Sequence, residues 1–252
     1  MSSETGYFAY DADMERVFAP NSKETYENYL VQLEELVLQY LPKGSHIFDL
    51  CCGRGELAQL LQNKGFQVTG LDGSEVMLHY ARKNAPSVEF ILDDARYFKF
   101  PPTFHAVVSI YNSLTEVTIL EELESIFQNV YAALLENGIF AFEAFLEEVF
   151  LPYSVPNITG DVKDDYAWIG CTTYDIEKKI FRESYTNFQF MKGEWQRSEV
   201  TLLTRAYSIA EIQSALEKVG FTEVSIYDEE RDLGVEKRAG KVCIVCRKPL
   251  IA

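Results

Sequence analysis

The residues with the clearest chemical pattern lie between an apolar run and a predicted helix. The run begins at His46 and carries Asp49, and a turn of small residues with Gly53 and Gly55 follows it. Glycine permits positive φ and removes a Cβ where a ligand must approach the backbone. A strand, a glycine turn and a helix in this order bring a nucleotide-like ligand to a helix N-terminus. Asp49 is placed to accept hydrogen bonds from the turn or from an amine of that ligand.

Two further acids follow predicted strands. The strand over 66–72 ends at Asp72, about twenty residues beyond the glycine turn, where a Rossmann-like domain places the carboxylate that accepts both ribose hydroxyls. The strand over 88–92 leads into Asp93 and Asp94. The alternative role for Asp72 is an ordinary helix cap. The alternative for Asp94 is a solvated loop acid, with Asp93 competing for its role.

The elements that must position these acids alternate regularly. Helix and strand patterns succeed one another five times over about a hundred residues, which predicts a parallel, doubly wound sheet. A helix over 22–41 precedes it, 152–165 is predicted as a loop, and 166–207 reads as an antiparallel meander inserted before the last helix. The predicted organisation is an N-terminal lid segment and helix (1–41), a core (42–150 and 206–252) and an antiparallel β insertion (151–205).

These motifs together resemble the class I S-adenosylmethionine-dependent methyltransferases. Asp49, Gly53 and Gly55 match the family's Asp-x-Gly-x-Gly-x-Gly motif, with Cys51 at its first glycine. The resemblance implies a Rossmann-like, seven-stranded, mostly parallel sheet with an antiparallel last strand, and S-adenosylmethionine as the cofactor. It also implies the cofactor-binding residues, which are Asp49, Cys51, Gly53, Gly55, Asp72, Gly73, Met77, Asp94, Ala95 and Ile110.

Other cofactors and functions fit the sequence less well. A nicotinamide dinucleotide fingerprint needs a third glycine where Glu56 stands, and an acid there would repel a pyrophosphate. S-adenosylmethionine carries a sulfonium and no phosphate, so it tolerates this acid. A regulatory protein that binds S-adenosylmethionine without turnover and a protein methyltransferase both stay open.

The predicted reaction is in-line methyl transfer to nitrogen or oxygen of a small molecule. Holding the nucleophile and the methyl group in line supplies much of the rate, so a general base is needed only if the nucleophile must lose a proton. No catalytic residue is assigned. The insertion resembles that of bacterial small-molecule methyltransferases, where it covers the active site; a dimer contact is the alternative. The residues expected to line the acceptor pocket, with core packing as the alternative for each tyrosine, are Tyr10, Tyr26, Tyr111, Asn112 and Glu143.

Composition limits the partners. The 252 residues carry a net charge of −16, which argues against a nucleic-acid surface. No apolar stretch is long enough for a membrane span, and the N-terminus lacks the pattern of a signal peptide. Five cysteines do not make a disulfide framework, and Cys243 and Cys246 are predicted as buried strand thiols with no metal. We therefore expect a cytoplasmic protein, with a homodimer as one possible assembly.

Overall fold

The computed structural model describes residues 22–235 and 240–250, so Tyr10 lies outside the described residues. A seven-stranded sheet forms the core in the order β10-β11-β5-β4-β1-β2-β3. β11 runs antiparallel to both β5 and β10, and the other pairs are parallel. This confirms the predicted fold class. The strands are β1 (His46–Leu50), β2 (Gln67–Asp72), β3 (Glu89–Leu92), β4 (Phe104–Ser109), β5 (Leu134–Phe145), β10 (Thr222–Asp228) and β11 (Lys241–Arg247).

Helices cover both faces of this sheet. Leu33 of α2 and Leu61 of α3 pack against one face, beside Ile47 of β1. Leu123 of α5 and Leu216 of α7 pack against the other face. Apolar strands covered on both sides are typical of a parallel sheet. The helices are α2 (Ser22–Leu36), α3 (Glu56–Asn63), α4 (Glu75–Asn84), α5 (Leu120–Ala133) and α7 (Ile209–Val219), with short turns η2 (Leu38–Tyr40), η3 (Ser113–Glu116), α6 (Glu147–Phe150) and η4 (Leu151–Ser154).

Chain order reverses between β1 and β4, which are neighbours in the sheet. From β1 the chain proceeds outward through β2 and β3, and from β4 it proceeds the other way to β5. Ligands of open α/β sheets bind outside the carboxyl ends of the strands at such a switch point. The segments after β1 and β4 therefore mark the edge where a site is expected.

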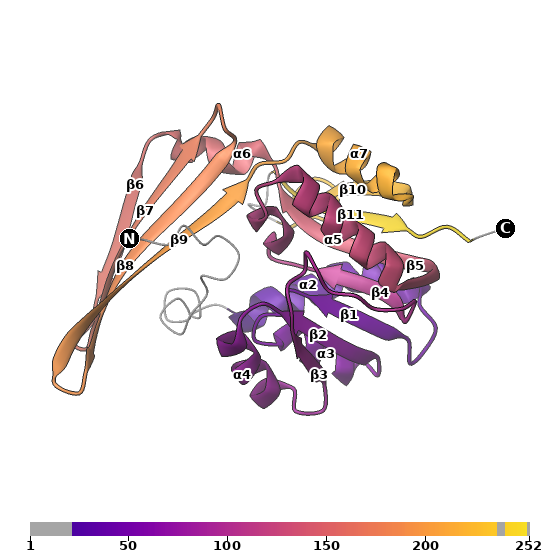
Figure 1. The fold of residues 1–252 in the computed structure, drawn as a ribbon, viewed down its shortest axis with the longest axis horizontal. Coiled ribbons are helices and arrows are strands. Elements are labelled where there is room, and N and C mark those ends of the chain that lie inside the picture. Colours follow the sequence, from indigo (N-terminus) through magenta and orange to yellow (C-terminus); the bar gives the residue numbers. More distant parts are fainter. Residues whose placement is uncertain (1–21, 236–239, 251–252) are drawn as a thin grey trace.

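The insertion forms a separate four-stranded antiparallel sheet, which stands to the left of the core in Figure 1. Its strands are β6 (Asn157–Val162), β7 (Tyr166–Asp175), β8 (Ile180–Met191) and β9 (Glu194–Arg205). The loop predicted over 152–165 is wrong in part, because it contains η4 and β6. All six residues of β6 are exposed, so no apolar alternation marks it, and pairing with β7 makes it a strand.

Two further predictions are refined. The first helix ends at Leu36 and is followed by the separate turn η2, so it is shorter than the predicted 22–41. Cys243 and Cys246 are buried in β11, as predicted. The division of the chain at residues 41, 150 and 205 stays a prediction. Among the described residues, no helix has the length and apolar character needed to cross a bilayer.

Candidate cofactor and acceptor site

The turn between β1 and α3 depends on left-handed backbone at three positions. Cys51, Gly53 and Gly55 have φ of 62°, 52° and 72°. A Cβ on Gly53 would meet open space, whereas one on Gly55 would lie 2.8 Å from Cζ of Phe90 and 3.0 Å from Cβ of Ala81. Gly53 therefore leaves room beside the turn, and Gly55 lets α3 pack closely. Cys51 adopts a conformation that disfavours a side chain by about 1 kcal/mol.

Two buried carboxylates lie beside this turn. Asp72 accepts hydrogen bonds from the backbone N–H of Gly53 (2.8 Å) and of Ser74 (2.9 Å). Asp49 is 1% exposed, and its Oδ2 has no hydrogen-bond partner among the residues that the structure describes. Burial, together with the negative charges of Asp72 and Glu56, raises the pKa of Asp49 to about 8. The site thus concentrates negative charge around an unsatisfied carboxylate oxygen.

The start of α4 completes this part of the site. The backbone N–H of Gly73 also donates to the Asp72 carboxylate, and burial raises the pKa of Asp72 against these donors. Ser74 caps the helix by accepting a hydrogen bond from the N–H of Met77 at 3.3 Å. Met77 is buried on the helix face turned to the core. The cap fixes the segment that carries Asp72.

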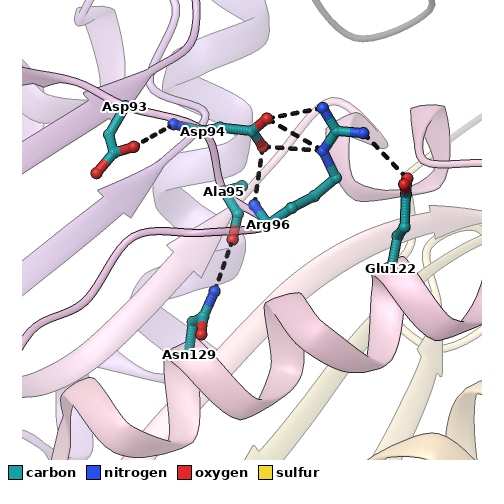
Figure 2. A network of polar contacts seen from close by, with 6 residues as sticks. All are labelled: Asp93, Asp94, Ala95, Arg96, Glu122 and Asn129. Atoms are coloured by element: carbon teal, nitrogen blue, oxygen red, sulfur yellow. Dashed lines mark hydrogen bonds and ion pairs between the residues drawn. The ribbon is translucent and has the colours of Figure 1, made fainter.

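The loop after β3 is held by its own ion pairs, as Figure 2 shows. Nη2 of Arg96 lies 2.7 Å from Oδ2 of Asp94, and Nε lies 3.1 Å from both carboxylate oxygens. Nη1 of Arg96 reaches Glu122 of α5 at 3.1 Å. The buried carbonyl of Ala95 accepts a hydrogen bond from Asn129 at 3.3 Å. The carboxylate expected to face the adenine amine is therefore already bound to a guanidinium.

The segment after β4 gathers three tyrosines. Tyr111 and Asn112 both have left-handed backbone, with φ of 61° and 58°, and such strain clusters at functional sites. The Tyr111 ring lies 5.3 Å from that of Tyr26 and 5.1 Å from that of Tyr29. Asn112 is 5% exposed, and its Oδ1 accepts a hydrogen bond from the N–H of Phe145 at 2.7 Å. The sequence expected Tyr26, Tyr111 and Asn112 to be neighbours, and the structure places them at the end of β4 and beside α2.

Glu143 lies deeper, beneath α2. It is 3% exposed, and both its oxygens accept the Tyr29 hydroxyl, at 2.9 and 2.8 Å. Burial and the charge of Glu229 raise the pKa of Glu143 to about 8. Neither Tyr29 nor Glu229 was singled out from the sequence. Tyr29 reads as part of an apolar helix face, and Glu229 belongs to a charged loop where no single acid stands out.

A second pair of acids joins the core to the insertion. Glu116 of η3 is half-buried, and burial with the charges of Glu183 and Asp72 raises its pKa to about 8. Glu183, on β8, accepts the hydroxyl of Tyr185 at 2.9 Å. The sequence gave no sign of this pair, because Glu116 and Glu183 come from different elements and neither sits in a motif. The insertion therefore faces the edge of the core that carries Asp72.

The residues around the glycine turn suit S-adenosylmethionine. The unsatisfied Oδ2 of Asp49 and the nearby acids attract a ligand with an ammonium and a sulfonium. Each oxygen of Asp72 keeps a lone pair beyond its backbone bond, which leaves it free to accept a ribose hydroxyl. The open space beside Gly53 leaves room for the ligand backbone. Ile110, the last predicted cofactor residue, is 9% exposed at the end of β4.

Comparison with known proteins agrees with this chemistry. Residues 47–138 match a family model described as a methyltransferase domain. The chain is 30% identical to "Putative methyltransferase YqeM" of Bacillus subtilis, over 72% of this chain and 75% of that protein. It is also 30% identical to dTDP-3-amino-3,4,6-trideoxy-alpha-D-glucopyranose N,N-dimethyltransferase of Streptomyces venezuelae, over 44% and 47% of the two chains.

A solved structure shares the whole fold. S-adenosylmethionine-bound CalS10, an amino pentose methyltransferase from Micromonospora echinaspora, superposes with a TM-score of 0.71 at 17% identity, covering 95% of this chain and 98% of that one. The strand order, the antiparallel last strand and the separate antiparallel sheet agree with such an enzyme. The chain therefore belongs to the class I S-adenosylmethionine-dependent methyltransferase family, and S-adenosylmethionine is its cofactor.

Proposed function

We propose that this methyltransferase acts on a small-molecule acceptor bound between the core sheet and the insertion. The observation that carries the proposal is the position of Glu116. It lies close enough to Asp72 of the core and to Glu183 of β8 for both charges to raise its pKa. A single pocket edge therefore joins the cofactor side to the insertion, and an acceptor held there lies beside the cofactor.

The cofactor side of the site is assigned to residues of the glycine turn and the adjoining strands. Asp72 binds the ribose hydroxyls, and Asp49 faces the cationic end of the ligand. Bound S-adenosylmethionine supplies an electrophilic methyl group. The protein's task is then to hold the acceptor nucleophile in line with that group and to exclude water. Tyr26 and Tyr111, whose rings are in contact, cover this region from α2 and the end of β4.

Relatives and charge support a small acceptor. Two of the similar proteins carry amino sugars in their names, one as an N,N-dimethyltransferase and one as an amino pentose methyltransferase. The net charge of −16 disfavours a polyanionic acceptor such as a nucleic acid. Half-buried acids at the pocket edge suit a neutral or cationic molecule.

The test is methyl transfer from methyl-labelled S-adenosylmethionine to separate panels of small amines, phenols and hydroxy acids, to a protein extract and to RNA. We expect label in a small-molecule panel and in neither macromolecular one. Asp72→Ala is the control, and it should weaken S-adenosylmethionine binding by about 100-fold or more, since it removes a buried charged acceptor. Label in protein alone, or full transfer by Asp72→Ala, contradicts the proposal.

A further inference from the structure

A small buried cavity lies between α2 and the strands β4, β5 and β11. It is large enough for about one water-sized group. Its polar lining comes from α2, from the end of β5 and from the segment after β10, whereas Ile110 connects it to the segment that follows β4. The polar side chains that define it here are Tyr29, Gln32, Glu143 and Glu229.

The two acids of this cavity form one unit. Glu143 is 3% exposed and Glu229 is 0% exposed, and their carboxyl groups hydrogen-bond to each other. Such a bond requires one proton between the two carboxyls, so the pair carries about one negative charge. Tyr29 donates its hydroxyl to both oxygens of Glu143 and fixes their orientation. Lys241 lies close enough to lower the pKa of Glu143, and its Nζ rests 4.2 Å from the centre of the Phe145 ring.

An independent observation comes from Gln32. This side chain is 8% exposed and lies one turn from Tyr29 on the same face of α2, because residues three apart share a helix face. Among the described residues, no hydrogen-bond partner is found for its amide. A buried amide without a partner is unfavourable, and native proteins rarely keep one. The amide oxygen therefore suits a donor that a ligand brings into the cavity.

We propose that this cavity binds the protonated amino group of an aliphatic amine acceptor, through the Glu143–Glu229 pair and the Gln32 amide. The inference rests on the proposed function and names its substrate class. An alkylammonium carries two or three N–H donors in a group of about the size of the cavity. It supplies hydrogen to both acceptors and balances the charge of the pair. The rest of the acceptor leaves past Ile110 toward the cofactor edge.

The first test measures binding, which does not depend on turnover. Methylammonium chloride and cyclohexylammonium chloride are titrated into the full-length protein saturated with S-adenosylhomocysteine, with sodium chloride at equal ionic strength as the reference. We expect the amines to raise the melting temperature above the reference. Glu143→Gln keeps an acceptor for the Tyr29 hydroxyl and should weaken this binding by about tenfold or more. Gln32→Leu should weaken it too, while leaving the unliganded protein at least as stable.

The matched control is Glu230→Gln, an exposed acid next to Glu229, which should bind the amines like the parent. Two results overturn the inference. One is an unchanged amine effect in Glu143→Gln. The other is competition between methylammonium and S-adenosylhomocysteine, which would assign the cavity to the ammonium of the cofactor instead.

The second test uses turnover on paired acceptors, cyclohexylamine with cyclohexanol and 3-amino-3-deoxyglucose with glucose. Methylation of an amine, with kcat/KM lowered about tenfold or more by Glu143→Gln and the affinity for S-adenosylmethionine kept, supports the inference. Methylation of the hydroxyl compounds alone overturns it and leaves the proposed function standing. Amine binding without transfer to any acceptor has the opposite meaning, because the cavity assignment then holds and the proposed function fails.

Discussion

The cofactor edge and the acceptor edge of this protein are built in different ways. At the cofactor edge the backbone does most of the work, since Gly53, Gly55 and the N–H groups around Asp72 fix the shape. At the acceptor edge side chains from distant elements meet, as Glu116 does with Glu183. The first edge is local in sequence, and the second exists only after the insertion has packed beside the core.

This difference has a consequence for substitution. A change in the glycine turn disturbs folding and cofactor binding together, because the same backbone serves both. A change on the insertion alters which acceptor fits, while the strands that carry Asp49 and Asp72 stay as they are. The predictions that follow separate the two edges by measuring stability, cofactor affinity and acceptor use on the same variants.

The largest effect is expected for Gly55→Ala. The new Cβ would lie 2.8 Å from Phe90 in a backbone conformation with φ of 72°. Left-handed strain and overpacking together should lower the free energy of unfolding by about 3 kcal/mol. Gly53→Ala is the matched control: it meets open space, so it should lose only about 1 kcal/mol from backbone strain. Equal losses in urea denaturation would contradict the different roles given to the two glycines.

The next effect is a pH dependence of the cofactor edge. The pKa of Asp49 is about 8 in the folded protein, far above its value in an unfolded chain. The folded state then holds a proton that the unfolded state has lost, so stability without cofactor falls as pH rises from about 5 to about 8. Asp49→Asn should make the slope between pH 5.5 and 7.5 shallower by about 1 kcal/mol per pH unit. Parallel slopes for the two proteins would show that Asp49 titrates normally.

A smaller effect is expected where the insertion returns to the core. Tyr207 is 1% exposed, and its hydroxyl donates to the carbonyl of Val117 at 2.7 Å, directly after η3. Tyr207→Phe leaves that carbonyl without its donor and should reduce stability by about 1 kcal/mol. Because Val117 adjoins Glu116, we also expect a raised KM for the acceptor with unchanged cofactor affinity. A loss of cofactor affinity larger than that of acceptor use would join the two edges into one.

The smallest effect on the cofactor is expected for Glu183→Gln. Glu183 sits on β8 and accepts the Tyr185 hydroxyl, a role that glutamine keeps. Removing its charge should change the affinity for S-adenosylmethionine by less than about twofold, since the insertion does not carry the cofactor residues. Acceptor kcat/KM, measured alongside by methyl transfer, should change more. If the two constants changed together, the insertion would be part of the cofactor edge.

Much of the cofactor edge is predictable from the sequence because its signals are short-range. The glycine turn, the acids that follow strands and the cap at Ser74 each occupy a few consecutive residues. Strand and helix patterns are local too, so the doubly wound sheet is predicted correctly. Cys51 shows a limit, because sequence alone does not reveal that it adopts left-handed backbone with φ of 62°.

Long-range contacts decide the remainder. The sequence determines the sheet, the cofactor and the glycine turn, since each follows from backbone requirements within a few residues. Only the tertiary structure binds Asp94 to Arg96 and Glu122, makes a strand of the exposed 157–162 segment and pairs Glu143 with Glu229 beneath α2. Those pairings join residues far apart along the chain, and their chemistry arises from burial and mutual charge, which no local pattern records.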